Sequence, residues 1–128
     1  MTRLERMLIV GSGSIAARHV RLSRELFPGV SLARLRREFR PPAEPSLADA
    51  FNEVFDSWDE ALNWNPDAAI VANAASAHYD ALTRLVKARV PSLVEKPLAI
   101  ATEGLDQLAR EVTVGEVPVL VGYQLRYH

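Results

Sequence analysis

The sequence predicts a doubly wound α/β domain of the Rossmann type, with a mostly parallel sheet covered by helices. Two observations indicate this fold class. Short apolar runs alternate with longer amphipathic stretches along most of the chain, which is the pattern of repeated strand–helix–strand units. The first apolar run is followed directly by a glycine-rich turn and then by a helical pattern. The length of 128 residues suits a single domain.

The chain is expected to begin with a strand and a long helix. Residues 6–10 form an apolar run that predicts a fully buried strand. Residues 14–26 are predicted to form a helix that a Phe-Pro-Gly sequence ends. Ile15, Leu22 and Leu26 fall on one stripe of this helix, so we expect them to face the core.

The middle of the chain predicts two further strands and a short helix. Residues 30–35 form the next apolar run, and the proline-rich residues 38–52 are the best candidate for a loop. A short strand is expected at residues 53–55. Ser57 and Glu60 have the spacing of a capping box, so a helix should begin there.

The second half of the chain repeats the alternation. Ser76 is the expected N-cap of a helix at residues 77–88, and Thr102 is the expected cap of the last helix. The strands of this half are expected at residues 68–72, 92–94 and 117–122. The residues expected on the buried faces of its helices are Ala81, Leu82, Leu85, Val86, Leu105, Leu108, Ala109 and Val112.

Composition excludes several classes of protein. Fifteen basic and 16 acidic side chains give a net charge of −1, which argues against a nucleic-acid-binding surface and against a polybasic membrane anchor. Cysteine is absent, so disulfides and cysteine-based zinc sites are excluded, and no metal site is predicted. No apolar run is long enough to cross a bilayer, and the first strand begins too early for a signal peptide. A cytoplasmic protein is expected.

The strongest candidate for a binding site is the glycine-rich turn after the first strand. Its sequence G-S-G-S-I-A matches the G-x-G-x-x-G/A pattern of dinucleotide-binding folds. There the first glycine makes a tight turn, the second lets the backbone approach a pyrophosphate, and the helix N-terminus offers free N–H groups. A turn without a ligand is the alternative, but the position between strand and helix favours a binding site. The predicted cofactor-binding residues here are Gly11, Ser12, Gly13, Ser14 and Ile15.

The end of the second strand bears on the choice of cofactor. The dinucleotide fingerprint places an acidic residue there, which binds the ribose hydroxyls of NAD. This chain has Arg36 and Arg37 instead. Arginine suits the 2′-phosphate of NADP, so NADP is slightly favoured over NAD, and the alternative is that both arginines are solvated surface residues. The missing acid also weakens a methyltransferase interpretation.

The turn after the strand at 68–72 lies at the same edge of the predicted sheet. Ala72 and Asn73 precede a helix whose backbone N–H groups could face a cofactor. His78 lies in the first turn of that helix, where a surface or capping role is the alternative to cofactor binding. Ala72, Asn73 and His78 are predicted to belong to the cofactor site.

The Glu-Lys-Pro turn is the best candidate for catalysis. Glu95, Lys96 and Pro97 follow a buried strand, and Pro97 fixes the turn and can take a cis bond. A lysine here can hydrogen-bond a substrate hydroxyl and, when desolvated, exchange its proton, which arginine cannot do. The alternative is a lysine–glutamate pair at a strand end. Lys96 is the predicted catalytic residue.

Taken in chain order, these segments resemble one oxidoreductase family. G-S-G-S-I-A, A-N-A-A-S-A-H, V-E-K-P-L-A and the closing V-G-Y-Q-L-R-Y-H resemble the N-terminal domain of the glucose–fructose oxidoreductase, inositol dehydrogenase and rhizopine-catabolism (Gfo/Idh/MocA) family. The resemblance implies that the glycine turn binds the pyrophosphate of NAD or NADP and that residues 72–78 border the cofactor. It also implies that Lys96 contacts the reacting hydroxyl, and that Glu95 and Arg126 belong to the cofactor-binding set.

The resemblance further implies a two-domain enzyme. Family members continue into a second α/β domain with further catalytic residues, commonly an aspartate and a histidine on one helix. We therefore expect residues 1–123 to be the dinucleotide-binding Rossmann domain and residues 124–128 to begin the connection to a substrate domain absent from this chain. The whole enzyme is expected to be a homo-oligomer. Residues 73–75 depart from the Thr-Pro-Asn or Thr-Pro-Ser that the family often shows.

The leading hypothesis is the NAD(P)-binding domain of an oxidoreductase. It would transfer hydride between a nicotinamide cofactor and a secondary alcohol of a sugar, cyclitol or sugar nucleotide, and this chain alone is expected to be inactive. The alternative is a non-catalytic dinucleotide-binding sensor or regulatory module. Lys96 favours the enzyme, whereas the missing second domain favours either the sensor or a truncated chain. Truncation is the favoured explanation, because the sequence ends within the closing motif at residues 125–128.

Overall fold

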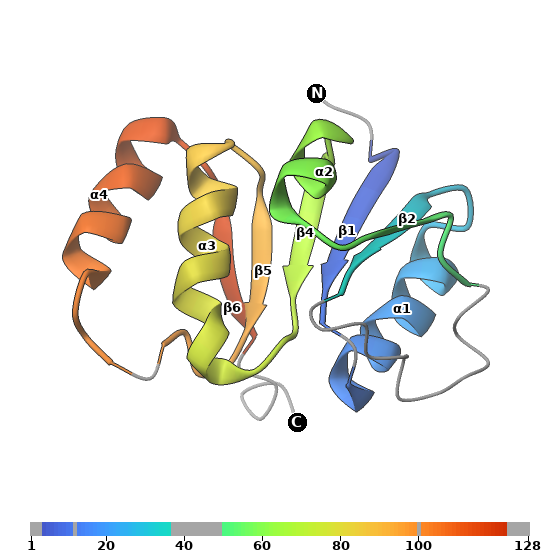
Figure 1. Ribbon diagram of the computed structural model, residues 1–128, viewed down its shortest axis with the longest axis horizontal. Coiled ribbons are helices and arrows are strands. Elements are labelled where there is room, and N and C mark those ends of the chain that lie inside the picture. The colour runs from blue at the N-terminus through green and yellow to red at the C-terminus, as the bar shows by residue number, and fades with distance from the viewer. Residues whose placement is uncertain (1–3, 12, 37–49, 100, 123–128) are drawn as a thin grey trace.

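A computed structural model describes residues 4–11, 13–36, 50–99 and 101–122 of the chain. Its centre is a six-stranded sheet in which all neighbouring strands run parallel (Figure 1). The strands are β1 (Arg6–Val10), β2 (Ser31–Leu35), β3 (Glu53–Phe55), β4 (Ala68–Val71), β5 (Ser92–Glu95) and β6 (Val119–Gly122). The helices are α1 (Ser14–Leu26), α2 (Trp58–Asn63), α3 (His78–Lys87) and α4 (Leu105–Gly115), with a 3₁₀ turn at Ala75–Ala77. Within the ranges described, none of these helices is long and apolar enough to cross a membrane.

The strand order β3-β2-β1-β4-β5-β6 makes the sheet doubly wound. The chain builds outward from β1 to β3 and then returns to the other side of β1 with β4. At this switch point the connections leave the sheet in opposite directions, so a crevice opens beyond the carboxyl ends of β1 and β4. The predicted fold class, a doubly wound and mostly parallel sheet, is confirmed.

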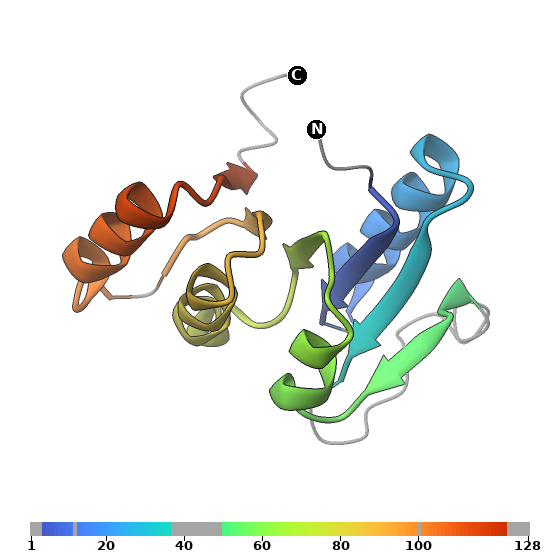
Figure 2. The same cartoon turned by 90° about the horizontal axis from the view of Figure 1, so that it is seen from above.

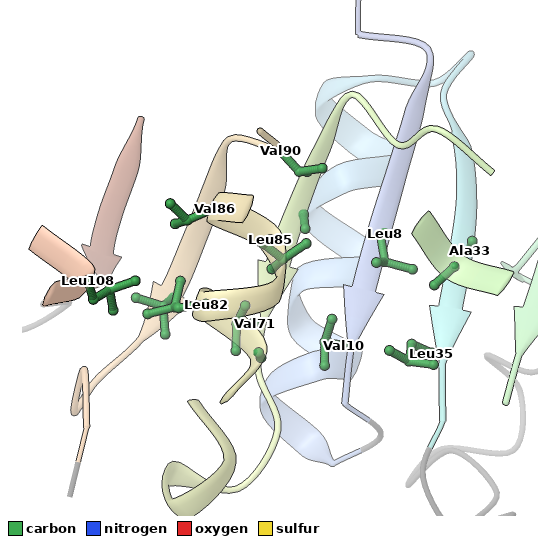
Figure 3. Packing of buried hydrophobic residues seen from close by; sticks show 14 residues of the cluster. Leu8, Val10, Ala33, Leu35, Val71, Leu82, Leu85, Val86, Val90 and Leu108 are labelled. Atoms are coloured by element: carbon green, nitrogen blue, oxygen red, sulfur yellow. The ribbon is translucent and has the colours of Figure 1, made fainter. Parts of the chain in front are cut away.

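Helices cover both faces of the sheet. α1 lies on one face, and α2, α3 and α4 lie on the other (Figure 2). Alternate residues of each strand point to the two layers. The larger apolar cluster joins the sheet to α2, α3 and α4, and Figure 3 labels these of its members: Leu8, Val10, Ala33, Leu35, Val71, Leu82, Leu85, Val86, Val90 and Leu108. The cluster beneath α1 contains Met7, Ile9, Ala16, Val20, Val30, Leu32, Ile70 and Ala72.

The buried face of α1 differs from the predicted one. Ile15, Leu22 and Leu26 are 42%, 39% and 69% exposed, so the prediction that this stripe faces the core is wrong. Small side chains bring the helix close to the sheet, and two polar residues are buried because each finds a partner there. The buried residues of α1 are Ala16, Ala17, His19, Val20 and Ser23.

The predicted cap of α2 is present and that of α3 is not. Ser57 Oγ accepts a hydrogen bond from the Glu60 N–H at 3.2 Å, which confirms that a helix begins there with Ser57 as its N-cap. Ser76 does not cap α3, because a 3₁₀ turn passes through it and the helix begins only at His78. The prediction for Ser76 is therefore wrong.

The last helix begins later than predicted. α4 starts after Gly104, whose φ of +79° is outside helical geometry. Thr102 accepts the Leu105 N–H at 3.2 Å through its backbone carbonyl, and the structure shows no side-chain cap for this helix. Leu108 is buried as predicted, whereas Ala109 is exposed, because α4 covers the rim of the sheet and packs mainly on α3.

The exposed position of the Ile15, Leu22 and Leu26 stripe can be tested by comparing a substitution in it with one at a buried residue of α3. Leu82→Ala removes a fully buried side chain and should lower the free energy of unfolding by about 2–5 kcal/mol. Leu26→Ala should change it by less than about 0.5 kcal/mol, because that side chain is largely in solvent. Urea denaturation followed by circular dichroism measures both values. A loss at Leu26 as large as that at Leu82 would contradict the exposed placement of the stripe.

Candidate functional site

An open cleft lies at the switch point, beyond the carboxyl ends of β1 and β4. Its volume of about 750 Å³ is within the range of roughly 300–1,000 Å³ that is usual for small-molecule sites. Its walls come from the ends of four strands and from α1, α2 and α3. The lining residues are Val10, Gly11, Gly13, Ser14, Ile15, Leu35, Arg36, Asp56, Ser57, Trp58, Ala72, Asn73, Ala74, Ala77, Asp80 and Arg84.

The two glycines after β1 have different structural tasks. Gly11 has a φ of +134°, and a Cβ there would lie 2.5 Å from the carbonyl oxygen of Ala72. Gly11 is therefore required where the turn after β1 packs against the turn after β4. Gly13 has an ordinary φ of −80°, and a Cβ added to it would meet no atom within 4 Å. Because Gly13 lines the cleft, this open space lets a ligand approach its backbone.

The start of α1 suits an anion. Its first helical hydrogen bond runs from the Ala17 N–H to the Gly13 carbonyl at 3.0 Å, so the preceding N–H groups have no partner within the helix. None of the described side chains caps this end, and the first turn contains no acidic residue. Ser14 and Ile15 line the cleft at this point. The pyrophosphate of a dinucleotide fits the charge and the hydrogen-bond donors of such an end.

Opposite charges meet where β2 and β3 end. Arg36 lines the cleft, and its Nε donates to Asp56 Oδ1 at 2.7 Å. Burial of Arg34 on β2, together with the nearby Arg36 guanidinium, lowers the pKa of Arg34, while Asp56 acts in the opposite direction. A carboxylate is thus present in the cleft, although it comes from the end of β3 and not of β2. Arg37 lies outside the described residues.

The turn after β4 contributes an unused hydrogen-bond acceptor. Ala72 and Asn73 both line the cleft, and the Ala72 N–H donates to the Val10 carbonyl at 2.8 Å. Asn73 Oδ1 is buried and accepts no hydrogen bond from the described residues. Leaving a buried acceptor without a donor is unfavourable, so this turn at the edge of the cleft carries an energetic cost.

Four charged or aromatic residues of the cleft wall were not predicted. They are Asp56, Trp58, Asp80 and Arg84. Arg84 lies over the Trp58 ring, 5.7 Å from its centroid, and its Nε donates to Asp80 Oδ2 at 3.1 Å. Asp56 could have been found, because it directly follows a predicted strand. The contact between Trp58 and Arg84 could not, because it depends on how α2 and α3 pack in space.

His78 lies beside the cleft and not in its wall. The residue is buried, with only 1% of its surface exposed. Ring atom Nδ1 lies 2.7 Å from the carbonyl oxygen of Pro97, and Nε2 lies 3.0 Å from that of Asn73. The predicted role of His78 in binding the cofactor therefore gains no support, because the ring is occupied by these two turns.

The Glu-Lys-Pro turn also lies outside the cleft wall. Glu95 is buried, and its Oε1 accepts a hydrogen bond from His19 Nε2. Lys96 is exposed, and its peptide bond to Pro97 is cis. Two other residues predicted to bind the cofactor, Ser12 and Arg126, lie outside the described residues.

The doubly wound sheet and the cleft above its glycine turn define a dinucleotide-binding Rossmann domain. Residues 5–123 match the family model GFO_IDH_MocA, described as "Oxidoreductase family, NAD-binding Rossmann fold". The chain belongs to this Gfo/Idh/MocA oxidoreductase family. The resemblance seen in its sequence motifs is confirmed.

The relatives of this chain are longer than it is. It is 29% identical over 138 residues to the inositol 2-dehydrogenase of Pseudarthrobacter chlorophenolicus, covering 99% of this chain and 39% of that protein. It is 44% identical over 94 residues to a myo-inositol dehydrogenase of Streptomyces leeuwenhoekii, covering 66% of this chain and 28% of that protein. The WlbA dehydrogenase of Thermus thermophilus, solved with NAD and UDP-GlcNAcA, superimposes with a TM-score of 0.79 at 25% identity, covering 97% of this chain and 43% of that one. The chain thus spans less than half the length of these relatives.

The two glycines should respond differently to substitution. Gly13→Val should abolish dinucleotide binding and leave the fold intact, because its φ suits valine and the side chain would fill the space above the turn. Gly11→Ala should instead lower the free energy of unfolding, by about 1–3 kcal/mol, because a Cβ there is strained and meets Ala72. Titration calorimetry and thermal unfolding separate the two effects. Undiminished binding by a folded Gly13→Val protein would overturn the site.

Proposed function

We propose that the chain is the NAD(P)-binding part of a dehydrogenase that transfers hydride to or from a secondary alcohol carbon. The observation that carries this proposal is the link between two turns. His78 lies within hydrogen-bond distance of both Pro97 and Asn73, so the turn with Lys96 is held beside a turn that lines the cleft. A binding module needs only the cleft, whereas an exposed lysine held beside it favours an enzyme over a sensor.

Residues of the cleft would hold the cofactor along its length. Gly13, Ser14 and Ile15 would meet the pyrophosphate, because the space above Gly13 is open and no described side chain caps the start of α1. Arg36 and Asp56 would meet the adenosine ribose at the ends of β2 and β3. When bound, the nicotinamide ring supplies the acceptor or donor of hydride.

Lys96 would move the proton of the substrate hydroxyl. When the alcohol is oxidised, the carbon loses hydride and the hydroxyl loses its proton to the Lys96 amine, which leaves a ketone. In the reverse direction the ammonium returns the proton to the oxygen. Lysine suits this task because its amine can lose and regain a proton, whereas a guanidinium stays charged.

The proposed substrate class is a sugar, a cyclitol or a sugar nucleotide. Curated relatives are inositol dehydrogenases, and the WlbA structure at 25% identity contains UDP-GlcNAcA. These compounds share secondary alcohols on a ring, which is the functional group that the proposed role of Lys96 requires. Family membership and the exposure of Lys96 beside the cleft support this substrate class.

We further propose that NADP is the preferred cofactor, and that Asp56 keeps the difference in affinity between NADP and NAD small. The Arg36 guanidinium lines the cleft and can donate to a 2′-phosphate. Asp56, whose Oδ1 lies 2.7 Å from Arg36 Nε, offsets that positive charge and can accept hydrogen bonds from an unphosphorylated ribose. The two side chains therefore act in opposite directions on the choice between NADP and NAD.

Fluorescence titrations of NADPH and NADH on one sample test this preference. NADPH should bind more tightly, and its advantage should shrink as salt rises, because salt screens the arginine–phosphate attraction. Arg36→Gln should weaken NADPH binding by about tenfold, the value of one hydrogen bond to a charged group, and Asp56→Asn should enlarge the advantage. Equal affinities, or tighter binding of NADH by the unaltered protein, would make Arg36 an ordinary surface residue.

Lys96→Met tests proton transfer in an active enzyme that contains this chain and its substrate domain. Methionine keeps an apolar stem and removes the amine, so kcat should fall by about 100-fold or more. Cofactor affinity should change little, because the glycine turn provides the phosphate contacts. Lys87→Met, at an exposed position of α3, is the matched control. Near-normal turnover would make Lys96 structural, and an equal loss of cofactor binding would make it a cofactor ligand.

A further inference from the structure

The backbone on either side of Lys96 is held by buried side chains. Lys96 itself is exposed. Glu95, immediately before it, is buried and bonded to His19. The carbonyl of Pro97, immediately after it, lies 2.7 Å from His78 Nδ1. A solvent-exposed amine therefore stands on a turn that is anchored at both neighbouring residues.

His19 reaches the turn from α1. Its Nε2–H donates to Glu95 Oε1, and both residues are buried on the face of the sheet that α1 covers. Glu95 is paired in register with Gly122 of β6, and a Cβ on Gly122 would lie 3.5 Å from Glu95 Oε2. Without His19, this carboxylate would lose its charged or polar partner in a buried place, which is strongly unfavourable.

His78 reaches the turn from α3, on the opposite face of the sheet (Figure 2). Each ring nitrogen faces a carbonyl oxygen, one from Pro97 and one from Asn73. Carbonyl oxygens only accept hydrogen bonds, so the nitrogen that carries the N–H donates to one of these turns, the other nitrogen lies against the second turn, and neither is directed to a ligand. The imidazole ties the turn after β5 to the turn after β4.

We propose that His19 and His78 are positioning residues, which fix Lys96 by holding its two neighbours from opposite faces of the sheet. The helix that carries His19 also begins at the glycine turn, so the pyrophosphate site and the lysine are set by one rigid element. Hydride and proton transfer from one alcohol need such fixed placement. The proposal rests on the proton-transfer role proposed for Lys96, but the placement of the turn can be measured without turnover.

The chain provides its own probe, because its sequence has lysine at only two positions, Lys87 and Lys96. Labelling with [¹⁵N]lysine therefore yields two backbone amide signals. The Lys96 signal reports on the Glu-Lys-Pro turn. The Lys87 signal, from the exposed end of α3, is the internal control.

His78→Asn and His78→Gln form a matched pair. The asparagine amide can replace Nδ1 and keep the bond to Pro97, whereas the glutamine amide can replace Nε2 and keep only the bond to Asn73. His78→Gln should therefore shift or broaden the Lys96 signal, and His78→Asn should leave it near its original position. In the active enzyme, kcat of His78→Gln should be lower than that of His78→Asn by about tenfold or more, with similar cofactor affinity.

His19→Gln and His19→Leu test the other anchor. Glutamine keeps a donor for Glu95 in place of ring Nε2, whereas leucine removes it. His19→Leu should move the Lys96 signal, and His19→Gln should restore it towards the original position. Should His19→Leu fail to fold, the double variant His19→Leu/Glu95→Leu takes its place, because it leaves no buried charge.

Circular dichroism and the Lys87 signal establish that each variant is folded. An unmoved Lys96 signal in folded His78→Gln and His19→Leu proteins would overturn the proposal. Equal shifts in both members of the His78 pair would overturn it as well, since ring packing and not the bond to Pro97 would then be responsible. Failure of the proposed function would give a different result. In that case the Lys96→Met enzyme would keep its turnover, while the Lys96 amide signal of the histidine variants, which retain Lys96, would still shift as described.

Discussion

The close contact between the turns after β1 and β4 is the constraint on which the cleft depends. Gly11 passes so near the backbone of Ala72 that a Cβ would lie 2.5 Å from its carbonyl oxygen. The strands stay paired up to this point, because the Ala72 N–H donates to the Val10 carbonyl. Two segments distant in the sequence are therefore held together as one edge. Gly13 and Asn73 line a common cleft as a result.

The polar contacts around this edge divide into exchangeable and fixed ones. Arg36 with Asp56, and Arg84 with Asp80, are partly exposed ion pairs in the wall of the cleft. Such pairs contribute at most about 1 kcal/mol each, so a ligand can replace them at little cost. The contacts of His78 with the two turns and the pair of His19 with Glu95 are buried. Breaking these contacts leaves polar groups without partners. The cleft can thus adapt its charged wall while the turns behind it stay in place.

The sequence predicted the fold well because its signals were local. Apolar runs, the glycine turn and the N-cap at Ser57 each follow from a few adjacent residues, and the strands and the cap lie at or near their predicted places. The buried stripe of α1 was mispredicted because burial there depends on contacts with distant strands. His19 is buried because Glu95 meets it from β5, and no pattern within α1 contains that information. Ser76 failed as a cap for a related reason, since a 3₁₀ turn occupies its place.

The same distinction applies to the functional residues. Gly11 and Gly13 belong to a motif with a strand before it and a helix after it, and both line the cleft, while their cofactor role stays a prediction. Asp56 supplies a carboxylate from the end of β3, where the fingerprint has no expectation. Trp58 and Arg84 come from different helices and meet only in the folded protein.

The position of β1 in the sheet has a consequence for how the domain forms during synthesis. β1 is synthesised before the other five strands of this sheet, yet it lies in the interior of the sheet, between β2 and β4. At about 5–20 residues per second, several seconds separate the synthesis of Gly11 from that of Ala72. During that time the nascent chain already contains the whole glycine fingerprint, but one wall of the cleft does not exist. A ligand can therefore help to stabilise the domain only after β4 has joined the sheet, and a shorter piece of the chain would keep the motif without the site.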